Sequence, residues 1–550
     1  MPTARPRAAR PELSWSGWGD PALATPLPDG LSALLRQALG ITGGRAAPAS
    51  IEDLELEPVR LVPRAAAELE AVVGKVNARG DHEARARHAL GKSTLDLLRL
   101  RANGPIAAPD LALMPADHDE VLALLRICAR HGVAVTPFGG GTSVVGGLAP
   151  EAAQFAGAVA IDVRRMNALV ALDEVSRLAV LEPGLRGPEA EQLLGERGYT
   201  IGHFPQSYEY ATLGGFAATR SSGQASAGYG RFDELVLALR VATPAGTFTL
   251  GRAPRSAAGP DLRQLVLGSE GSLGVITQVT VAVRPTPGRR LYQGWRLPSF
   301  AAGADALRRL VQDGPTPTVM RLSDEAETAI GLAQPAELDT PAEAAEAAGG
   351  CLAIVGFEGT EDEVAARQLA TAASLTAAGA TPVPGAGDGW ARDRYRGPYL
   401  RDALLDSGAL VETLETVCFW SVLPSLYAAV TGAVRETLTG LGCPPVILAH
   451  ISHVYPAGAS LYFTVACNQL EDPIEQWRAA KAAAGEAILA TGGSITHHHG
   501  VGRDHRAWYE REVGSLSIAL LGEVKRTLDP AGILNPGVLI PRLPPRTGSE

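Results

Sequence analysis

Lysine is scarce in this chain: only four of its 49 basic residues are lysines, namely Lys75, Lys92, Lys481 and Lys525. The formal net charge is −10. A protein that binds nucleic acid needs a basic face to displace counterions from phosphates, so this balance argues against a nucleic-acid partner. The strong preference for arginine over lysine is typical of a GC-rich bacterial source.

Cysteine pairs and long apolar runs are also missing. The five cysteines are scattered without a CxxC pair: Cys128, Cys351, Cys418, Cys443 and Cys467. This pattern predicts reduced, mostly structural thiols. No apolar run approaches the length of a bilayer span, and Arg5, Arg7 and Arg10 are not followed by the apolar core of a signal peptide. Because Gly548 to Glu550 is not a peroxisomal tripeptide, we expect a cytoplasmic protein.

The length of 550 residues exceeds what one hydrophobic core supports, which predicts two or three domains. Residues 1–104 are predicted to form an N-terminal extension and a helical segment. Residues 105–287 alternate helices with strands, and residues 288–490 repeat that alternation. Residues 491–550 form a C-terminal segment. The predicted fold class is therefore α+β.

One helix and the strand after it are predicted with particular detail. Asp117 to Gly132 has acidic residues in its first turn, apolar residues at helical spacing and a glycine stop. Val133 to Pro137 follows as a buried strand. Further helices are expected at 341–348 and near Ser515 to Leu528.

The stretch PFGGGTSVVGG, Pro137 to Gly147, follows that strand directly. Gly139 to Gly141 lack a Cβ, so successive backbone N–H groups can converge on a pyrophosphate. The hydroxyls of Thr142 and Ser143 add further donors. A glycine cluster of this kind also suits a tight surface turn, and the motif alone does not decide between the two.

Two later stretches have the composition of ligand loops. Pro205 to Gly230 is crowded with small and hydroxyl residues, which let the backbone approach a flat ring system. Gly268 to Pro285 places a glycine-rich turn against a strand. A long irregular loop is the alternative for the first stretch, although such loops inside compact domains are usually functional.

Tyr462 and a histidine triplet are the candidate reactive side chains. On an apolar strand, a tyrosine such as Tyr462 is more often a core residue with a satisfied hydroxyl. His497, His498 and His499 cannot all bind one metal from an extended strand, because neighbouring side chains point to opposite faces. We predict a proton-relay or hydrogen-bonding cluster and no metal, with a structural role as the alternative; a metal at His450 and His453 stays open.

Taken together, PFGGGTSV, QSYEYAT, TRSSG, EGSLGVIT, SLYF and HHHGVG occur in this order and resemble the motifs of the alkyldihydroxyacetonephosphate synthase family, within the vanillyl-alcohol-oxidase type of FAD-binding fold. The resemblance implies tight, noncovalent FAD. It places the cofactor against Pro137, Phe138, Gly139, Gly140, Gly141, Thr142, Ser143, Gln206, Ser207, Tyr208, Glu209, Tyr210, Ala211, Thr212, Thr219, Arg220, Ser221, Ser222, Glu270, Gly271, Ser272, Leu273, Gly274, Val275 and Ile276.

The resemblance also implies a reaction. Synthases of this family exchange the acyl chain of acyl-dihydroxyacetone phosphate for a fatty alcohol, in ether-lipid synthesis, through an adduct between flavin and substrate. A base must remove a proton beside the ketone, and Tyr462 matches the family's catalytic tyrosine. His497, His498 and His499 match its catalytic triplet, and one of them is expected to lower the pKa of the tyrosine.

Substrate contacts and partners follow from the same resemblance. Arg401 in GPYLRD matches the arginine that binds the substrate phosphate, and Arg321 in VMRLSD matches a second sensitive arginine. Residues 105–287 become the FAD-binding domain and 288–490 the cap, while 491–550 packs the histidines back on the FAD site. We expect a homodimer that takes a lipid-like phosphate substrate into a tunnel at the domain boundary, with peripheral membrane contact and no nucleic acid.

Two other functions stay open. FAD-dependent 2-hydroxyacid dehydrogenases of the D-lactate or glycolate type share the fold but usually carry a metal-binding HxGDGNxH pattern, where this chain has HVYPAGASLY. Thr464 stands where the synthases tend to be aromatic, which weakens the substrate assignment. A flavin-binding protein without turnover is the third interpretation.

Overall fold

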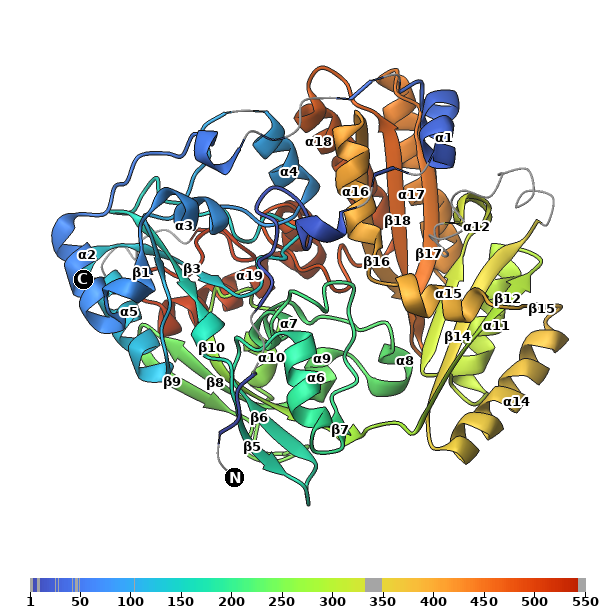
Figure 1. The fold of residues 1–550 in the computed structure, drawn as a ribbon, viewed down its shortest axis with the longest axis horizontal. Coiled ribbons are helices and arrows are strands. Elements are labelled where there is room, and N and C mark those ends of the chain that lie inside the picture. The colour runs from blue at the N-terminus through green and yellow to red at the C-terminus, as the bar shows by residue number, and fades with distance from the viewer. Residues whose placement is uncertain are drawn as a thin grey trace.

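The computed structural model describes residues 3–6, 10–24, 26–27, 29–41, 43–44, 48, 50–102, 104–331 and 349–542. The stretch 341–348, predicted to be helical, lies outside the described residues. The chain folds into two lobes: the first carries most of the blue to green elements and the red C-terminal helix, and the second carries the yellow to orange elements and one blue N-terminal helix (Figure 1). This arrangement agrees with the mixed helix and sheet class predicted from the sequence.

The first lobe contains three of the described sheets. A four-stranded sheet has the order β1-β2-β4-β3, with β2, β4 and β3 parallel, and a five-stranded antiparallel sheet has the order β5-β6-β10-β8-β9. The strand bounds are β1 Ala78–Arg79, β2 Leu111–Leu113, β3 Ala134–Phe138, β4 Ala158–Asp162, β5 Leu169–Asp173, β6 Leu178–Leu181, β8 Val236–Thr243, β9 Gly246–Leu250 and β10 Val275–Ala282. A short ribbon pairs β7 Tyr199–Thr200 with β11 Arg284–Pro285.

The second lobe is built on a seven-stranded sheet in which neighbouring strands run antiparallel, with the order β15-β12-β14-β13-β17-β18-β16. Its strands are β12 Arg289–Leu297, β13 Val319–Ser323, β14 Cys351–Gly359, β15 Thr381–Val383, β16 Ala409–Phe419, β17 Val446–Val454 and β18 Gly458–Asn468. The last three strands of this order are consecutive neighbours that border the first lobe, so their side chains reach the space between the lobes.

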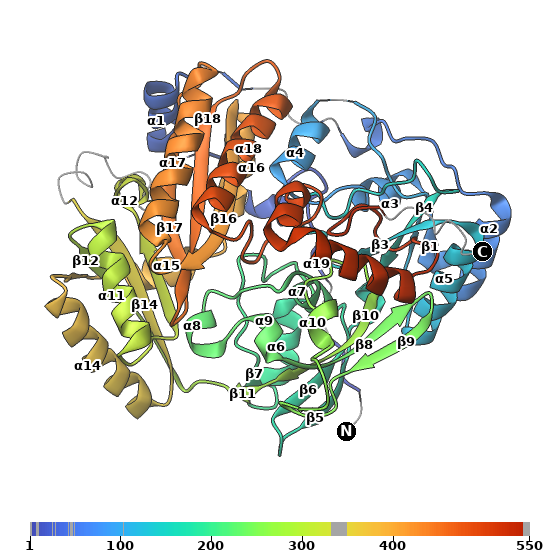
Figure 2. The same cartoon turned by 180° about the vertical axis from the view of Figure 1, so that it is seen from behind.

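Helices cover the outer faces of these sheets (Figures 1 and 2). The described helices are α1 Asp29–Leu39, α2 Pro63–Val73, α3 His82–Arg87, α4 Thr94–Arg101, α5 His118–His131, α6 Gly187–Gly195, α7 Leu213–Thr219, α8 Ser226–Tyr229, α9 Phe232–Leu235, α10 Arg263–Val266, α11 Phe300–Gln312, α12 Glu325–Ile330, α14 Glu361–Ala377, α15 Ala386–Asp393, α16 Gly397–Asp406, α17 Leu423–Gly440, α18 Pro473–Thr491 and α19 Arg506–Leu528.

Helix α5 shows why local patterns here predict local structure well. The Asp117 side chain accepts hydrogen bonds from the N–H groups of Asp119 and Glu120, which caps the first turn. The helix ends at Gly132, whose φ of +63° suits glycine. Strand β3 then follows, so the predicted helix and strand are confirmed, and the glycine-rich loop begins at the end of β3.

Both ends of the chain cross between lobes. Helix α1 lies at the end of the second lobe in both views, and Leu31 and Leu35 pack there against Leu404 of α16 and Val411 of β16 (Figures 1 and 2). Helix α19 returns to the first lobe. It begins at Arg506 rather than near Ser515, because the region before the non-helical Gly514 is also helical. None of the described helices is both long and apolar enough to cross a membrane.

Candidate active site

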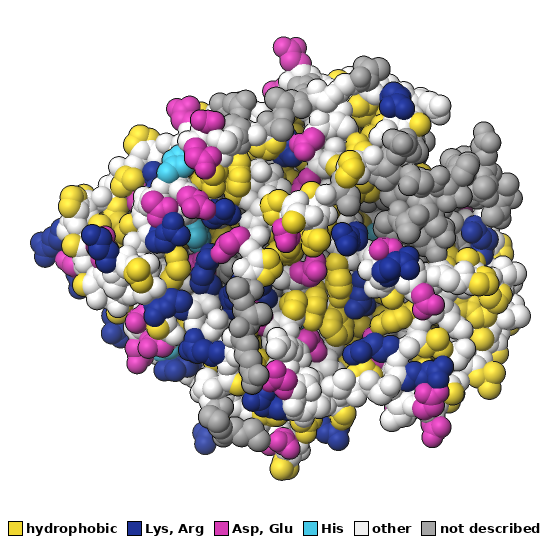
Figure 3. Space-filling model, in the orientation of Figure 1, with side chains coloured by type: hydrophobic (Ala, Val, Ile, Leu, Met, Phe, Trp, Pro, Cys, Tyr) yellow, Lys and Arg dark blue, Asp and Glu magenta, His cyan; other side chains and the backbone are white. Residues whose placement is uncertain are grey.

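A cavity of about 550 Å³ lies between the two lobes. Its first wall is drawn from loops of the first lobe within 137–143, 206–212, 219–222 and 270–276. Its second wall comes from strands β16, β17 and β18 together with helix α16. Hydrophobic side chains gather along the boundary between the lobes (Figure 3). Segments that are hundreds of residues apart in the sequence therefore meet around one space.

The loop after β3 presents free backbone donors to this cavity. The N–H groups of Gly139 to Ser143 donate to no acceptor among the described residues, and all these residues line the cavity. A Cβ at Gly140 would lie 2.1 Å from the carbonyl oxygen of Tyr210, so a side chain there would push the two loops apart. The loop is therefore closely backed, while its N–H groups remain available to an anion.

Three polar residues form a row across strands β17, β18 and β16, and two of them, His450 and Tyr462, line the cavity. His450 on β17 lies opposite Tyr462 on β18, which lies opposite Glu415 on β16. The rings of His450 and Tyr462 stack with centroids 4.9 Å apart. Burial raises the pKa of Tyr462 to about 12, although the Thr413 side chain and the charge of Arg401 act in the opposite direction. Tyr462 therefore keeps its proton at neutral pH.

The carboxylate of Glu415 holds the histidine triplet in place. The backbone N–H groups of His497, His498 and His499 donate to it over 2.7, 3.0 and 2.9 Å. Burial alone would raise the pKa of Glu415, but the histidine loop and the hydroxyl of Thr496 hold that pKa well below its usual value. The three residues are thus fixed as a turn around one anion.

The triplet does not activate Tyr462 in the way the sequence suggested. Burial lowers the pKa of all three histidines, to about 3 for His499, so their rings are neutral at pH 7. The ring of His499 meets Tyr462 edge-on, with centroids 5.7 Å apart. The expected lowering of the pKa of Tyr462 by these histidines is therefore wrong, because neutral rings supply no positive charge and burial of the phenol dominates.

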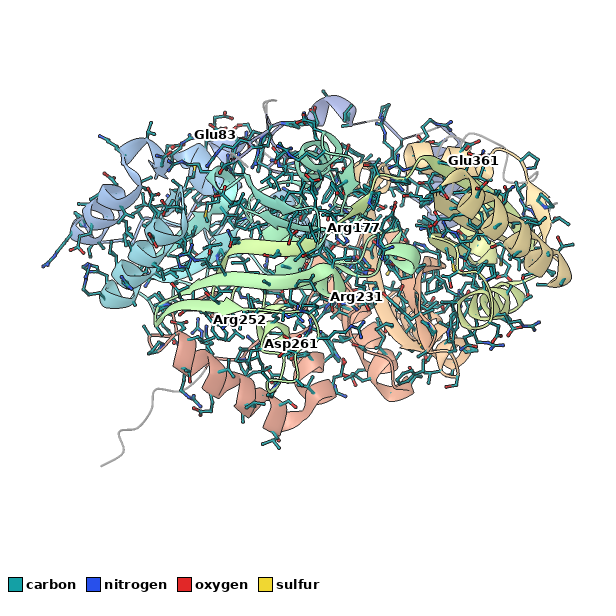
Figure 4. The ribbon with its side chains drawn as sticks, turned by 90° about the horizontal axis from the view of Figure 1, so that it is seen from below. Glu83, Arg177, Arg231, Arg252, Asp261 and Glu361 are labelled. Atoms are coloured by element: carbon teal, nitrogen blue, oxygen red, sulfur yellow. The ribbon has the colours of Figure 1, made fainter. Side chains whose placement is uncertain are left out.

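A fourth histidine, His453, lies beside the triplet. Nδ1 of His453 forms hydrogen bonds with the hydroxyls of Ser222 and Ser226, over 3.1 and 2.9 Å. Burial, followed by His497, His498 and Arg231, lowers the pKa of His453 well below its usual value. Arg231 lies where the green elements meet the orange strands (Figure 4).

This cluster is the group of described residues that could hold a metal. One ring nitrogen from each of His453, His497 and His498 lies within 4.8 Å of the others. The separation of Nδ1 of His497 from Nδ1 of His498 is 3.0 Å, and the hydroxyl of Tyr455 lies 2.7 Å from Nε2 of His497. Sequence reasoning considered the triplet and His453 separately and missed this combination. Hydrogen bonds account for the cluster without an ion, so the expectation of no metal stays a prediction.

Four arginines line the cavity, namely Arg321, Arg394, Arg396 and Arg401. The two that the sequence singled out, Arg321 and Arg401, have different partners. Nη2 of Arg321 donates to Glu327 over 2.6 Å, so a buried carboxylate offsets its charge. Arg401 donates to the carbonyl oxygen of Lys92 over 2.7 Å and to Asp402 over 3.3 Å. In the described part of the chain the Nε–H of each of these two arginines finds no acceptor. Arg401 is the more available cation, because its carboxylate partner is the more distant.

An N-terminal strap, defined here as residues 13–20, fixes the helix that carries Arg401. The N–H of Trp18 donates to Asp402, and the N–H of Asp20 donates to the hydroxyl of Tyr399 over 3.0 Å. Nζ of buried Lys92 donates to the carbonyl oxygens of Ser14 and Trp15, over 2.6 and 2.9 Å. Trp18 thus packs against Tyr399 of helix α16.

Lys92 also reaches the glycine loop through its own backbone. Its N–H donates to the carbonyl oxygen of Ser143 over 2.6 Å, while its carbonyl oxygen accepts from Arg401. The strap also contacts the first lobe through Trp18, whose ring packs edge-on against Tyr210 with ring centroids 6.1 Å apart. One lysine therefore connects the strap, the glycine loop and the arginine.

The cavity continues away from the polar row as an apolar arm. Beyond the polar row, the cavity face carries Thr413 and Val411 on β16, Leu448 and Val446 on β17, and Thr464 and Ala466 on β18. Helices α1 and α16 close the other side. The residues of this arm are Leu31, Leu35, Leu39, Leu400, Leu404, Val411, Val446, Leu448 and Ala466. A site with charged groups at one end and leucine and valine at the other suits an amphiphilic ligand.

Comparison with known proteins agrees with these features. Residues 109–250 match a family model described as an FAD binding domain, and residues 286–539 match the C-terminal domain of FAD linked oxidases. The alkyldihydroxyacetonephosphate synthase of Dictyostelium discoideum is 33% identical over 582 aligned positions, which cover 98% of this chain and 95% of that protein. The chain belongs to the alkyldihydroxyacetonephosphate synthase family.

A solved alkyldihydroxyacetonephosphate synthase structure superposes with a TM-score of 0.80 at 31% identity, covering 96% of this chain and 98% of the other. The fold is therefore the FAD-binding fold of the vanillyl-alcohol-oxidase type. A more distant relative is the mitochondrial D-lactate dehydrogenase [cytochrome] of Arabidopsis thaliana, 29% identical over 79% of this chain and 74% of that protein.

The structure fits the FAD that this synthase family uses. Free N–H groups after β3 suit a pyrophosphate, and the small residues of the other loops leave room for flat rings. Of the predicted cofactor residues, those that line the cavity are Pro137, Phe138, Gly139, Gly140, Gly141, Thr142, Ser143, Gln206, Ser207, Ala211, Thr212, Thr219, Ser221, Ser222, Glu270, Gly271, Gly274, Val275 and Ile276. Six others lie outside its wall: Tyr208, Glu209, Tyr210, Arg220, Ser272 and Leu273.

Some of these residues form hydrogen bonds that hold the loops of the synthase site in place. Arg220 donates to the carbonyl oxygens of Leu267 and Gln264, and the hydroxyl of Ser272 donates to the carbonyl oxygen of Ser269. Glu270 lines the cavity, but its carboxylate accepts from the N–H groups of Val501 and Gly502, just after the triplet. Burial raises the pKa of Glu270 to about 7. Its part in the synthase is thus to join the FAD wall to the histidine turn.

Sequence reasoning missed three residues that shape this synthase site. Glu415, Glu327 and Lys92 belong to no recognisable motif, and each acts through contacts with residues far away in the sequence. The only signal was chemical: a lysine and two carboxylates within otherwise buried stretches require partners. Their partners became visible only once strands and helices were assembled.

Proposed function

We propose that this protein is an FAD-dependent synthase that exchanges the acyl chain of acyl-dihydroxyacetone phosphate for a fatty alcohol. One observation carries the proposal: a single cavity joins the loops expected to bind FAD, the arginines Arg321 and Arg401, and an apolar arm. A phosphate head group needs a fixed cation, and an acyl or alkyl chain needs an apolar channel. The curated relatives named for the same synthase activity support this choice.

The residues of the chain divide the work by chemistry. Arg401 takes the substrate phosphate through its planar guanidinium, which is supported by Lys92 and Asp402. Tyr462, which keeps its proton, donates a hydrogen bond to a substrate oxygen. Helices α1 and α16 keep water away from the apolar arm. When bound, FAD supplies a ring that can accept an electron pair from the substrate and return it, so the overall exchange needs no external oxidant.

A dehydrogenase acting on 2-hydroxyacids is the second candidate. The pairing of His450 with Glu327 beside Arg321 favours it, because a neutral imidazole and a cation suit removal of a proton from a hydroxyacid. The relationship to a D-lactate dehydrogenase agrees with this reading. A flavin-binding protein without turnover would use the same FAD loops but respond to neither substrate.

The absorbance of the bound FAD separates the three functions. The purified holoprotein is mixed, without oxygen or electron acceptor, with palmitoyl-dihydroxyacetone phosphate in one cuvette and D-lactate in another. We expect the acyl ketone phosphate to bleach the FAD absorbance and D-lactate to leave it unchanged. Bleaching by D-lactate alone would favour the dehydrogenase, and no response to either would favour a binding protein.

We also propose a cytoplasmic homodimer that meets its lipid substrate by peripheral contact with a membrane. These points rest on the sequence. Light scattering of the purified protein and co-sedimentation with phosphatidylcholine vesicles measure them directly. A monomer in solution, or no protein in the vesicle pellet, would contradict the respective point.

A further inference from the structure

A carboxylate and an imidazole are paired at the cavity wall, next to Tyr462. Glu327, on helix α12, places Oε1 and Oε2 each 3.1 Å from Nδ1 of His450. Both residues line the cavity, although Glu327 is almost fully buried and the side chain of His450 is 10% exposed. This pair belongs to none of the motifs that indicated the function.

The contacts define which ring nitrogen of His450 carries a proton. Two carboxylate oxygens face Nδ1, so that nitrogen must donate rather than present a lone pair to them. Nη2 of Arg321 lies 3.1 Å from the same Nδ1 but donates over the shorter 2.6 Å to Glu327. Arg321 therefore neutralises the carboxylate, while Nδ1–H of His450 points to it. Nε2 of His450 is left as the proton acceptor.

The groups around His450 keep it neutral. They are Arg321 on β13, Glu327 on α12, Tyr462 on β18 and His498 in the histidine turn. Burial and then the charge of Arg321 lower the pKa of His450, while Glu327 opposes them. Although burial opposes its ionisation, His450 and Arg321 lower the pKa of Glu327 to about 2. A charged carboxylate behind a neutral imidazole is the arrangement of a general base.

We propose that His450, oriented by Glu327, is the general base that removes the proton beside the substrate ketone, with Tyr462 as a hydrogen-bond donor rather than the base. This inference rests on the proposed synthase function. The C–H bond at the carbon that bears the acyloxy group breaks, and an N–H bond forms at Nε2. The electron pair moves into an enolate whose oxygen receives the hydrogen bond of Tyr462. His450 is then a catalytic residue and Glu327 a positioning residue.

The ring stack supports this division of roles. The planes of His450 and Tyr462 are only 16° apart, and both residues project from neighbouring strands into the same cavity. A phenol that keeps its proton is a poor base at pH 7 but a good donor to a developing oxyanion. An imidazole whose Nε2 carries no proton is a good base at that atom and cannot donate a hydrogen bond from it. Two adjacent side chains thus offer an acceptor and a donor to one substrate.

The tautomer can be measured without turnover. Protein labelled with ¹⁵N-histidine is observed by NMR, and the signals of His450 are assigned from their loss in His450→Gln. We expect Nδ1 to carry the proton in the wild-type protein, and we expect the tautomer preference to weaken in Glu327→Gln. A wild-type His450 protonated at Nε2, or charged at pH 7, would overturn the proposal.

Proton removal is measured as exchange of the substrate C–H with solvent. Holoprotein and palmitoyl-dihydroxyacetone phosphate are incubated in D₂O without alcohol, and deuterium at the carbon next to the ester oxygen is followed by NMR. We expect His450→Gln to slow exchange and turnover by about 100-fold or more while FAD content stays unchanged. Exposed His82→Gln, whose ring forms a hydrogen bond with the carbonyl oxygen of Ile51 outside the cavity wall, is the matched control.

The pH profile distinguishes a base from a structural residue. In wild type, kcat/KM rises with pH as His450 loses its proton, below the usual imidazole range because its pKa is lowered. Tyr462→Phe should reduce the rate but keep this acidic limb, whereas His450→Gln should remove it.

Two outcomes separate a failure of the role given to His450 from a failure of the proposed synthase function. Wild-type product formation with exchange in His450→Gln close to the wild-type rate would overturn the role of His450 but not the synthase function. No ether product and no exchange in wild type would overturn the synthase function itself, and the tautomer measurement would still report on the Glu327–His450 pair.

Discussion

Glu415 accepts a hydrogen bond of 2.7 Å from the backbone N–H of His497, although the two residues lie on different structural segments. The same carboxylate takes the next two N–H groups of the turn and the hydroxyl of Thr496. The histidine turn is therefore positioned by one strand residue of the second lobe. Because Tyr462 lies opposite Glu415 in the sheet, the tyrosine and the histidines share one anchor.

Replacing Glu415 by glutamine should loosen this anchor. Glutamine keeps the size but has no charge, and its NH₂ group would face N–H donors. We expect Glu415→Gln to lower the free energy of unfolding by about 2 kcal/mol, since hydrogen bonds to charged groups are worth about 1.5–3 kcal/mol. Urea denaturation measures it. The control is Glu361→Gln, which removes an exposed ion pair with Arg289 (Figure 4) and should change little. Equal stabilities of the two variants would contradict the anchor.

Glu327 should make stability depend on pH. Its pKa in the folded protein is about 2, below the ordinary value of 4.5. A depressed carboxyl pKa stabilises the fold above the unfolded value, and this contribution is lost as the pH falls from about 4.5 toward 2. We expect the difference in unfolding free energy between wild type and Glu327→Gln to shrink as pH falls through this window. Urea denaturation between pH 7 and 3 measures it, and a constant difference would contradict the ion-paired state.

Arg401→Lys should weaken binding of the phosphate substrate. Lysine keeps the charge but loses the planar donors that contact both Lys92 and an anion. We expect KM to rise about tenfold or more, because one charge-assisted hydrogen bond is worth about 1.5–3 kcal/mol. Steady-state kinetics with FAD content measured in parallel provide the test. Arg392→Lys, an exposed residue paired with Asp393, is the control, and an unchanged KM in Arg401→Lys would remove Arg401 from the phosphate site.

Lys92→Met should release the N-terminal strap. Methionine fills the buried space but cannot donate to the carbonyl oxygens of Ser14 and Trp15. We expect faster proteolysis near residues 13–20 and a higher KM for the phosphate substrate, because Arg401 loses part of its support. Exposed Lys75→Met should show neither effect. A strap that resists proteolysis equally in both variants would show that Lys92 is not its main tether.

Local features of this protein could be predicted from sequence, and long-range ones could not. The cap at Asp117, the glycine stop and the loop after β3 follow from neighbouring residues, so helix α5 and the glycine-rich loop were predictable. The row from His450 through Tyr462 to Glu415 depends on how three strands pair, which no local pattern fixes. The neutrality of the histidines likewise depends on burial. The likeness to a known family supplied Tyr462 and Arg401, but not the residues that hold them.

The transfer of the alcohol oxygen tests the central claim most directly. Holoprotein is incubated with palmitoyl-dihydroxyacetone phosphate and [¹⁸O]hexadecanol, without oxygen or electron acceptor, and the products are analysed by mass spectrometry. The proposed exchange predicts hexadecyl-dihydroxyacetone phosphate that carries ¹⁸O, together with unlabelled palmitate. Absence of the labelled ether, or its formation only when an electron acceptor is added, would contradict the proposal.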